Sequence, residues 1–286
     1  MHGVREFAYL SFSTFDYVKS QPDGCPPILA VPIASFAWSH DLNDFLLKCI
    51  IEGRIQEIMG ILIAIDGTDA SGKQTQSELL YKKLTEKGIK ARLVSFPAYD
   101  KESSALVKMY LAGAFGTDPS DVNAYAASVL YAADRFATYR TDWGKDHDDG
   151  VVIIADRYVS SNMIHQASKC GSDEEKDRFI AWLEELEYGH FGLPRPDRVL
   201  FLDMPPQVAA ELMRERANKI DSSQDKDIHE RNAQYLKKSY ENAQYISKLR
   251  GWTHISCVRG GRVRDIEDIS DEVTGLVMEM IVNGAR

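Results

Sequence analysis

Residues 67–75 have the composition and order of a loop that binds phosphate groups. They read Gly-Thr-Asp-Ala-Ser-Gly-Lys-Gln-Thr and follow the apolar run Ile61–Ile65. Gly67 and Gly72 allow the backbone to curl so that successive N–H groups point at one anion, and a helix beginning there adds its positive end. Lys73 is then placed to reach the β- and γ-phosphates of a nucleotide. The predicted nucleotide-binding residues are Gly67, Thr68, Asp69, Ala70, Ser71, Gly72, Lys73, Gln74 and Thr75.

The last position of this loop departs from the usual pattern. Phosphate-binding loops of this type carry Ser or Thr directly after the lysine, and that hydroxyl binds Mg²⁺. Here Gln74 follows Lys73, and Thr75 comes one residue later. A chance match is the competing interpretation, since glycines before helices are common. The strand–loop–helix context and the lysine favour phosphate binding.

Asp156 and Arg157 follow a second buried apolar run, Val151–Ala155. A carboxylate placed just past a buried strand can hold Mg²⁺, directly or through water. An adjacent arginine can bind phosphate oxygens with its two-pronged guanidinium. A structural ion pair is the alternative interpretation, and a position at the same edge as the phosphate loop favours the functional one.

Tyr131 and Arg135 are four residues apart in a predicted helix over residues 119–142, so they lie on one face. The tyrosine ring can stack on a base while the arginine binds a phosphate or a base carbonyl. Periodicity alone is also consistent with a core tyrosine and a surface arginine.

The polar segment from Met213 to Glu230 is predicted to be a mobile lid over the nucleotide. Its cations would then reach the charge that develops on a transferring phosphoryl group. A solvated loop is the alternative. The cations concerned are Arg214, Arg216 and Lys219.

The order of elements that must position these residues predicts an α/β fold. Buried strands alternate with helices, which gives a five-stranded parallel sheet with helices on both faces, and ligands bind at the carboxyl ends of its strands. The predicted strands are 61–65, 91–96, 151–155, 198–203 and 253–258. The predicted helices are 72–87, 103–114, 119–142, 173–188, 207–219, 228–249 and 265–282.

Composition limits the classes of partner. The net charge of −9 over 286 residues argues against nucleic acid or an acidic membrane as the main partner. No apolar run approaches the ~20 residues that span a bilayer. The cysteines are far apart and form no metal or disulfide pattern, which predicts a cytoplasmic protein; they are Cys25, Cys49, Cys170 and Cys257.

Residues 1–58 do not resemble the nucleotide-binding part of the chain. They contain scattered aromatics, several prolines and one candidate helix over Asp41–Ile58, and they match neither a secretory signal nor a transit peptide. Met59 stands directly before the first strand, so we expect residues 1–58 to be a mis-assigned start or a poorly ordered extension. An accessory segment that packs on the domain is the alternative.

Residues 59–286 resemble the thymidylate kinases, in the nucleoside monophosphate kinase class of P-loop proteins. The phosphate loop and the Asp-Arg-Tyr block together are a specific signal. The matching motifs occur in the order 67–73, Phe96-Pro97, Leu130–Arg135, Asp156–Asn162, Leu193–Asp197 and the lid of about 213–230.

The resemblance implies an ATP- and Mg²⁺-dependent transfer of the γ-phosphoryl group to dTMP. The ATP phosphates would be held by Lys73 and the loop amides, and Mg²⁺ would be placed by Asp69 and Asp156. Arg157 would bridge the donor and acceptor phosphates. The lid cations Arg214, Arg216 and Lys219 would act with Lys73, Asp69 and Arg157 in catalysis.

The resemblance also implies the acceptor site. Tyr131 would stack on thymine, Arg135 would bond to its polar edge, and Asn162 would lie near the acceptor. The full acceptor set is Phe96, Tyr131, Arg135, Asp156, Asn162 and His165. Relatives are commonly homodimers, which makes a homodimer the expected assembly.

Three residues depart from the family pattern. They are Gln74, Tyr99, where many relatives have arginine, and His165, where relatives usually have tyrosine or phenylalanine. These departures leave two alternatives open. One is a kinase for another deoxynucleotide or a deoxynucleoside, and the other is a nucleotide-binding regulatory protein that has lost catalysis.

Overall fold

The computed structural model describes residues 60–219, 228–229 and 232–283, and within 215–219 it describes the backbone alone. The expected extension, residues 1–58, lies outside this part of the chain, and so do residues 220–227 and 230 of the expected lid. In the described part, no helix is both long and apolar enough to cross a membrane.

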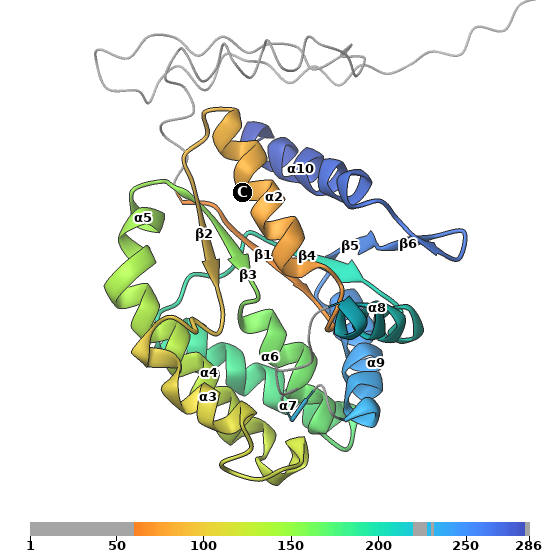
Figure 1. Cartoon of the computed structure of the whole chain (residues 1–286). Coiled ribbons are helices and arrows are strands. Elements are labelled where there is room, and N and C mark those ends of the chain that lie inside the picture. The colour runs from red at the N-terminus through yellow and green to blue at the C-terminus, as the bar shows by residue number, and fades with distance from the viewer. Residues whose placement is uncertain (1–59, 220–227, 230–231, 284–286) are drawn as a thin grey trace, which may run out of the picture. The chain divides into compact units, whose positions relative to one another are not determined.

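Five parallel strands form the central sheet, in the order β2-β3-β1-β4-β5 (Figure 1). This arrangement confirms the predicted α/β fold. Four of the strands are mainly apolar, whereas β5 has Ile255 as its one apolar residue, and each strand ends in a polar residue or a turn. The strands are β1 (Leu62–Gly67), β2 (Ala91–Ser95), β3 (Val152–Asp156), β4 (Arg198–Asp203) and β5 (Thr253–Ser256).

The register of the sheet brings the two chemical motifs to one edge. Ile65 in β1 is opposite Asp156 in β3, so the phosphate loop and Arg157 both begin where these paired strands end. On the other side of β1, Asp66 is opposite Phe201 of β4. Strands that are neighbours in the sheet therefore end at a common rim, as parallel topology requires.

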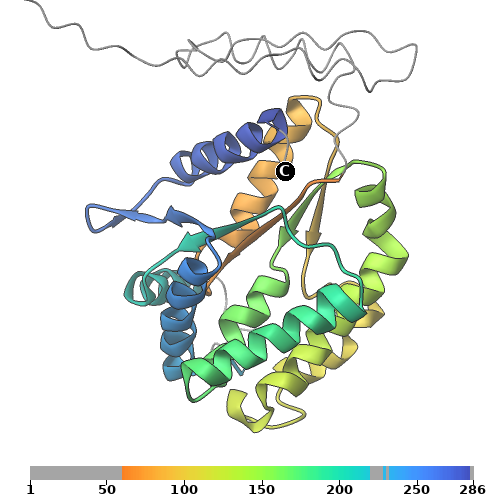
Figure 2. The same cartoon turned by 180° about the vertical axis from the view of Figure 1, so that it is seen from behind.

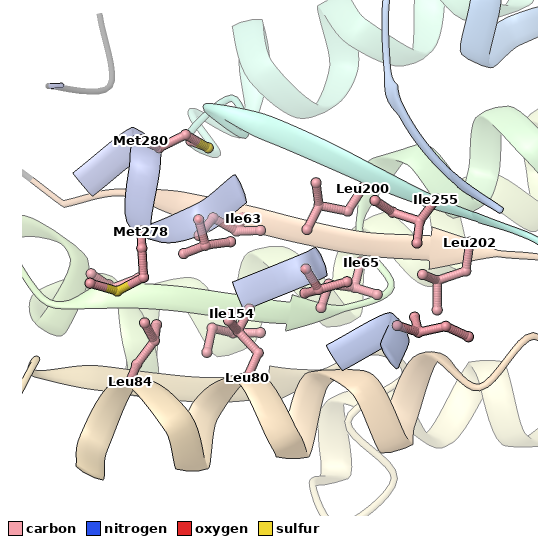
Figure 3. Packing of buried hydrophobic residues seen from close by; sticks show 14 of the residues in the cluster. Ile63, Ile65, Leu80, Leu84, Ile154, Leu200, Leu202, Ile255, Met278 and Met280 are labelled. Carbon is pink, nitrogen blue, oxygen red and sulfur yellow. The ribbon is translucent and has the colours of Figure 1, made fainter. Parts of the chain in front are cut away.

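Helices α2 (Lys73–Glu86) and α10 (Ile266–Asn283) cover one face of the sheet. Figure 3 shows side chains from the sheet meeting those of the two helices in one apolar cluster. Ile63 and Ile65 point to this face because side chains alternate along a strand. Both are fully buried against the layer that contains Leu80 and Leu84. Burying each such side chain contributes about 1.5–3 kcal/mol before the loss of chain entropy.

The opposite face packs against α6 (Val159–His165), α7 (Asp173–Glu184) and α9 (Ala233–Leu249), which Figure 2 shows from behind. Leu62 and Ala64, the alternate residues of β1, belong to this second cluster. Both faces of β1 are thus covered, which explains why its sequence is almost continuously apolar.

The remaining helices partly differ from the prediction. The expected helix over 119–142 is divided, because the Asn123 side chain accepts a hydrogen bond from the Ala126 amide at 2.9 Å and caps a new helix. A π-helical turn, Tyr139–Trp143, then leads into a short helix. Helix α6 and the β6–β7 hairpin (Val258–Arg259 and Arg262–Val263) were not expected. The other helices are α3 (Ala105–Leu111), α4 (Ala124–Thr138), α5 (Gly144–Asp148) and α8 (Pro206–Lys219).

Candidate active site

The phosphate loop closes tightly between β1 and α2. A Cβ atom on Gly67 would lie 2.7 Å from the Leu202 carbonyl oxygen and from Ser71 Oγ, so no side chain fits there. Gly72 has φ 86°, a conformation that glycine adopts readily, and α2 begins at the next residue. The loop therefore has the glycine-dependent shape that points backbone amides and a helix N-terminus at one anion.

Lys73 is buried, and in this structure its amine folds back onto the loop. Nζ donates a hydrogen bond to the Thr68 carbonyl oxygen at 2.7 Å and lies 3.5 Å from Ser71 Oγ. Burial, together with the nearby Arg157 guanidinium, lowers the pKa of Lys73 to about 8. A bound phosphate would favour the charged amine, so ligand binding and protonation of Lys73 are linked.

We expect ATP binding to be accompanied by proton uptake at Lys73 near pH 8. The free amine is partly neutral there, and phosphate oxygens raise its pKa, so affinity falls as the pH rises above about 8. Calorimetric titrations in two buffers of different ionisation enthalpy measure the protons taken up. The control is Lys73→Arg, whose guanidinium stays charged. Equal proton uptake by the two proteins would contradict the link.

Asp66 joins the phosphate loop to helix α6. Its carboxylate is fully buried and accepts hydrogen bonds from Ser160 Oγ at 2.7 Å and Ser161 Oγ at 2.8 Å. It also accepts one from the Gly67 amide at 3.0 Å. All three hydrogen bonds are short, and each is buried or partly buried. The carboxylate therefore fixes the start of the loop against α6.

Arg157 bonds to the phosphate loop from the end of β3. Its Nη2 donates to Asp69 Oδ1 at 2.8 Å, and its backbone has φ 67°, which is uncommon for a residue other than glycine. Burial alone raises the pKa of the Asp69 carboxyl, but Arg157 and the neighbouring cationic groups shift it well below its ordinary value. Asp69 is therefore an anion that orients the arginine at the rim.

The carboxylates at this rim fit a divalent cation. Asp156 Oδ1 is buried and has no hydrogen-bond partner among the described residues, and burial raises the pKa of this carboxyl. In the described part of the chain, no cluster of three or more His, Cys, Asp or Glu side chains could hold a metal by itself. Mg²⁺ bound by one or two carboxylates and substrate phosphates fits this donor set. The Gln74 amide takes no part, since its Nε2 donates to Glu78 at 2.9 Å on the surface of α2.

A cavity of about 70 Å³ opens beside the phosphate loop. Five of the six residues expected to bind the acceptor line it, and Asp156 is not among the lining residues. Asp69 and Arg157 line the same cavity, so donor-side and acceptor-side groups share one pocket. The complete lining is Asp69, Phe96, Pro97, Tyr99, Leu111, Tyr131, Arg135, Arg157, Ser161, Asn162, His165, Gln166 and His229.

Arg135 is buried at the pocket wall, contrary to the surface position that periodicity alone allowed. Its Nε and Nη2 donate to the two carboxylate oxygens of Glu187 at 2.6 and 2.7 Å. Burial lowers the pKa of Arg135, but Glu187 reverses the direction and keeps the guanidinium charged. Asn162 lies beside this pair, with its Nδ2 3.4 Å from Glu187 Oε1. Glu187 was missed, because its partner is 52 residues away in the sequence.

Two histidines form another part of the wall. The rings of His165 and His229 are nearly parallel, with centroids 6.4 Å apart. Burial lowers the pKa of His165 to about 3 and of His229 to about 4, so both are neutral near pH 7. His229 Nε2 lies 2.9 Å from Tyr110 Oη, which accepts a hydrogen bond from Lys169 Nζ at 3.1 Å. His229 was missed, because it belongs to the polar segment interpreted as a lid.

The structure reaches only part of the expected lid. Residues 213–219 form the end of helix α8, and Arg214 is exposed, with its Nε 3.4 Å from the Ala210 carbonyl oxygen. The side chains of Arg216 and Lys219 lie outside the described part of the chain. Ile228 packs against Val107 and Tyr110, and its amide donates to the Leu111 carbonyl oxygen at 3.2 Å. The far end of the segment is therefore attached to α3.

The sheet, the phosphate loop and the adjoining arginine-bearing pocket define the class of P-loop kinases that act on nucleotides. A family model described as thymidylate kinase matches residues 65–259, more than half of the chain. The chain belongs to the thymidylate kinase family, and it is a phosphotransferase of the nucleoside monophosphate kinase class.

Relatives come from bacteria and eukaryotes. A thymidylate kinase of Mycobacterium tuberculosis is 32% identical over 194 residues, covering 67% of this chain and 87% of that protein. A thymidylate kinase of Schizosaccharomyces pombe is 33% identical over 193 residues, covering 66% and 83%. A human thymidylate kinase is 31% identical over 152 residues, covering 53% and 65%.

Proposed function

We propose that this protein transfers the γ-phosphoryl group of ATP to dTMP, giving dTDP and ADP. The observation that carries this proposal is the position of Arg157. Its guanidinium bonds to Asp69 of the phosphate loop and also lines the pocket that contains Tyr131, Arg135 and Asn162. A cation in that position can contact the phosphates of two substrates bound end to end.

The two ends of the pocket differ in the chemistry of their residues. Near the loop, Arg157 supplies positive charge for phosphate oxygens, and Lys73, within the loop itself, supplies more. At the wall, Arg135 and Asn162 supply polar groups for a base edge, and the partly buried ring of Tyr131 supplies a flat face on which a base can stack. Phosphoryl transfer depends mainly on positioning and charge stabilisation, so this chain needs no general base of unusual pKa.

Mg²⁺ fits the rim, where we propose that Asp156 and Asp69 hold it together with the ATP phosphates. When bound, the ion neutralises charge on the phosphate oxygens and orients them. Asp156 Oδ1 supports this assignment, since a buried carboxylate oxygen without a partner among the described residues is a suitable ligand.

The test is ADP release from ATP and Mg²⁺ with a panel of acceptors. The panel contains dTMP, other deoxynucleoside monophosphates, ribonucleoside monophosphates and free deoxynucleosides. The proposal expects the highest kcat/KM with dTMP. Preference for another acceptor would assign a different substrate, and ATP binding without acceptor-stimulated ADP release would establish a regulatory protein.

We further propose that two copies pair through the outer faces of α3 and α4. These faces carry five large apolar residues that are each 38–47% exposed, and exposed apolar surface of this kind can mark an interaction site. Sedimentation velocity of the full chain tests for a dimer. The residues are Leu106, Met109, Tyr125, Val129 and Phe136, of which Phe136 is 38% exposed. A cytoplasmic location stays a prediction from the spacing of the cysteines.

A further inference from the structure

A second cavity, of about 550 Å³, lies away from the catalytic rim. Arg198 begins β4 and Thr253 begins β5, so the cavity is at the amino ends of these strands, whereas the phosphate loop is at a carboxyl end. Its volume is within the range of small-molecule sites, about 300–1,000 Å³. We call it the arginine groove, after Arg195, Arg198 and Arg250, which line it.

The three guanidiniums of the arginine groove donate no hydrogen bond to any described residue. Arg195 and Arg250 form only ion pairs with Glu184, at 3.6 and 3.3 Å, and Arg198 has no recorded partner in the described part of the chain. By contrast, Arg135 donates two hydrogen bonds to one carboxylate. Each guanidinium carries five N–H donors in a fixed plane. The groove therefore presents guanidinium donors that the described residues leave unused.

Aromatic side chains border these cations. The Arg195 guanidinium lies over the ring of Tyr188, 4.2 Å from its centroid, and Trp252 also lines the groove. Stacking holds the Arg195 plane in place and leaves its edge donors free. A planar guanidinium matches the oxygens of a phosphate better than a point charge does.

We propose that the arginine groove is a binding site for a ligand with a di- or triphosphate group, separate from the catalytic site. Three arginines line it beside two carboxylates, Glu184 and Asp197, so the groove keeps a local excess of positive charge in a chain whose net charge is −9. Nucleoside triphosphates and free inorganic polyphosphate share this chemistry.

Helix α6 connects the groove to the catalytic site. Ser160 lines the groove, and its hydroxyl donates to Asp66, the carboxylate that holds the start of the phosphate loop. Ser161, the next residue, lines the acceptor pocket. An occupied groove therefore contacts the helix that positions the catalytic loop.

The experiment titrates inorganic tripolyphosphate into the full chain by calorimetry, with wild type, Arg198→Gln and Arg250→Gln compared. We expect two classes of site in the wild type, one of them weakened about tenfold in each variant, as loss of one charge-assisted contact predicts. The control is Arg178→Gln, an exposed arginine of α7 outside the groove that makes the same change in net charge. The control should bind like the wild type.

Two results would overturn the proposal. One is a single class of site in the wild type, and the other is equal weakening by Arg178→Gln and Arg198→Gln. Repeating the titration with ATP separates the two ligand sources. If the Arg198-sensitive site binds ATP more tightly than tripolyphosphate, the ligand is a nucleotide. If it binds both equally, the phosphate chain alone is recognised. ADP release from ATP and dTMP, measured in parallel, tests the catalytic proposal independently.

Discussion

Replacing Arg157 with alanine is expected to lower kcat at least ~100-fold, the scale reported for removal of one preorganised charge-stabilising group. The guanidinium is held by Asp69 at 2.8 Å and faces the acceptor pocket, so it is already in place when charge develops on the transferring phosphoryl group. Alanine fits the left-handed backbone at this position no worse than arginine does. Steady-state kinetics with saturating ATP and dTMP measure the effect.

Separate measurement of kcat and KM for Arg157→Ala distinguishes a role in the transition state from a role in substrate binding. An interaction specific to the transition state lowers kcat and kcat/KM together, whereas uniform substrate binding raises KM alone. Lys73→Ala is expected to lower kcat on the same scale, since the amine lies within the loop. The exposed Arg178→Ala serves as the control for general charge effects. A turnover of Arg157→Ala within a few-fold of the wild type would remove Arg157 from the mechanism.

The second large effect is expected from Glu187→Ala, which should lower the free energy of unfolding by about 3–5 kcal/mol. The substitution leaves the Arg135 guanidinium buried without the carboxylate that receives two of its hydrogen bonds. Denaturant unfolding followed by circular dichroism measures the change. The affinity for the acceptor should also fall, because Asn162 and Arg135 lose the carboxylate that they share.

A double-mutant cycle isolates the pair. Replacing Arg135 and Glu187 together by apolar residues should cost much less than Glu187→Ala alone, since no unpaired charge then remains. Glu185→Ala, at an exposed position two residues away, is the control and should change stability by no more than about 0.5 kcal/mol. A loss below about 1 kcal/mol for Glu187→Ala would show that water reaches and stabilises Arg135.

The parts of the fold that sequence could predict are those with a strong local signal. Four of the five strands are mainly apolar runs bounded by polar residues or turns, β5 has Ile255 as its one apolar residue, and each was predicted within a few residues. Helix α6 was missed, because its seven residues, Val159–His165, are nearly all buried and show no amphipathic period. Both ends of the helix predicted over 119–142 were misplaced, because Asn123 caps a helix that begins at Ala124 and a π-helical turn follows Thr138.

The site divides in the same way. The phosphate loop and the Asp156-Arg157 block have distinctive local patterns, so the sequence alone predicts a site at these residues. Glu187 and His229 had no such pattern, since each acquires its role from a partner far away in the sequence. Prediction of such residues requires the tertiary fold, because a buried arginine needs a counter-ion but does not specify where in the chain it comes from.

Helix α4 turns Tyr131 and Arg135 toward the acceptor pocket and Tyr125, Val129 and Phe136 toward solvent. An acceptor bound in the pocket and a second copy of the chain bound to the exposed face would therefore both contact helix α4. Thermodynamic reciprocity then requires that acceptor binding changes the affinity of self-association by the same factor by which self-association changes the affinity for the acceptor. A nonzero coupling through α4 would make acceptor affinity depend on enzyme concentration, so binding titrations at nanomolar and micromolar enzyme would give different dissociation constants.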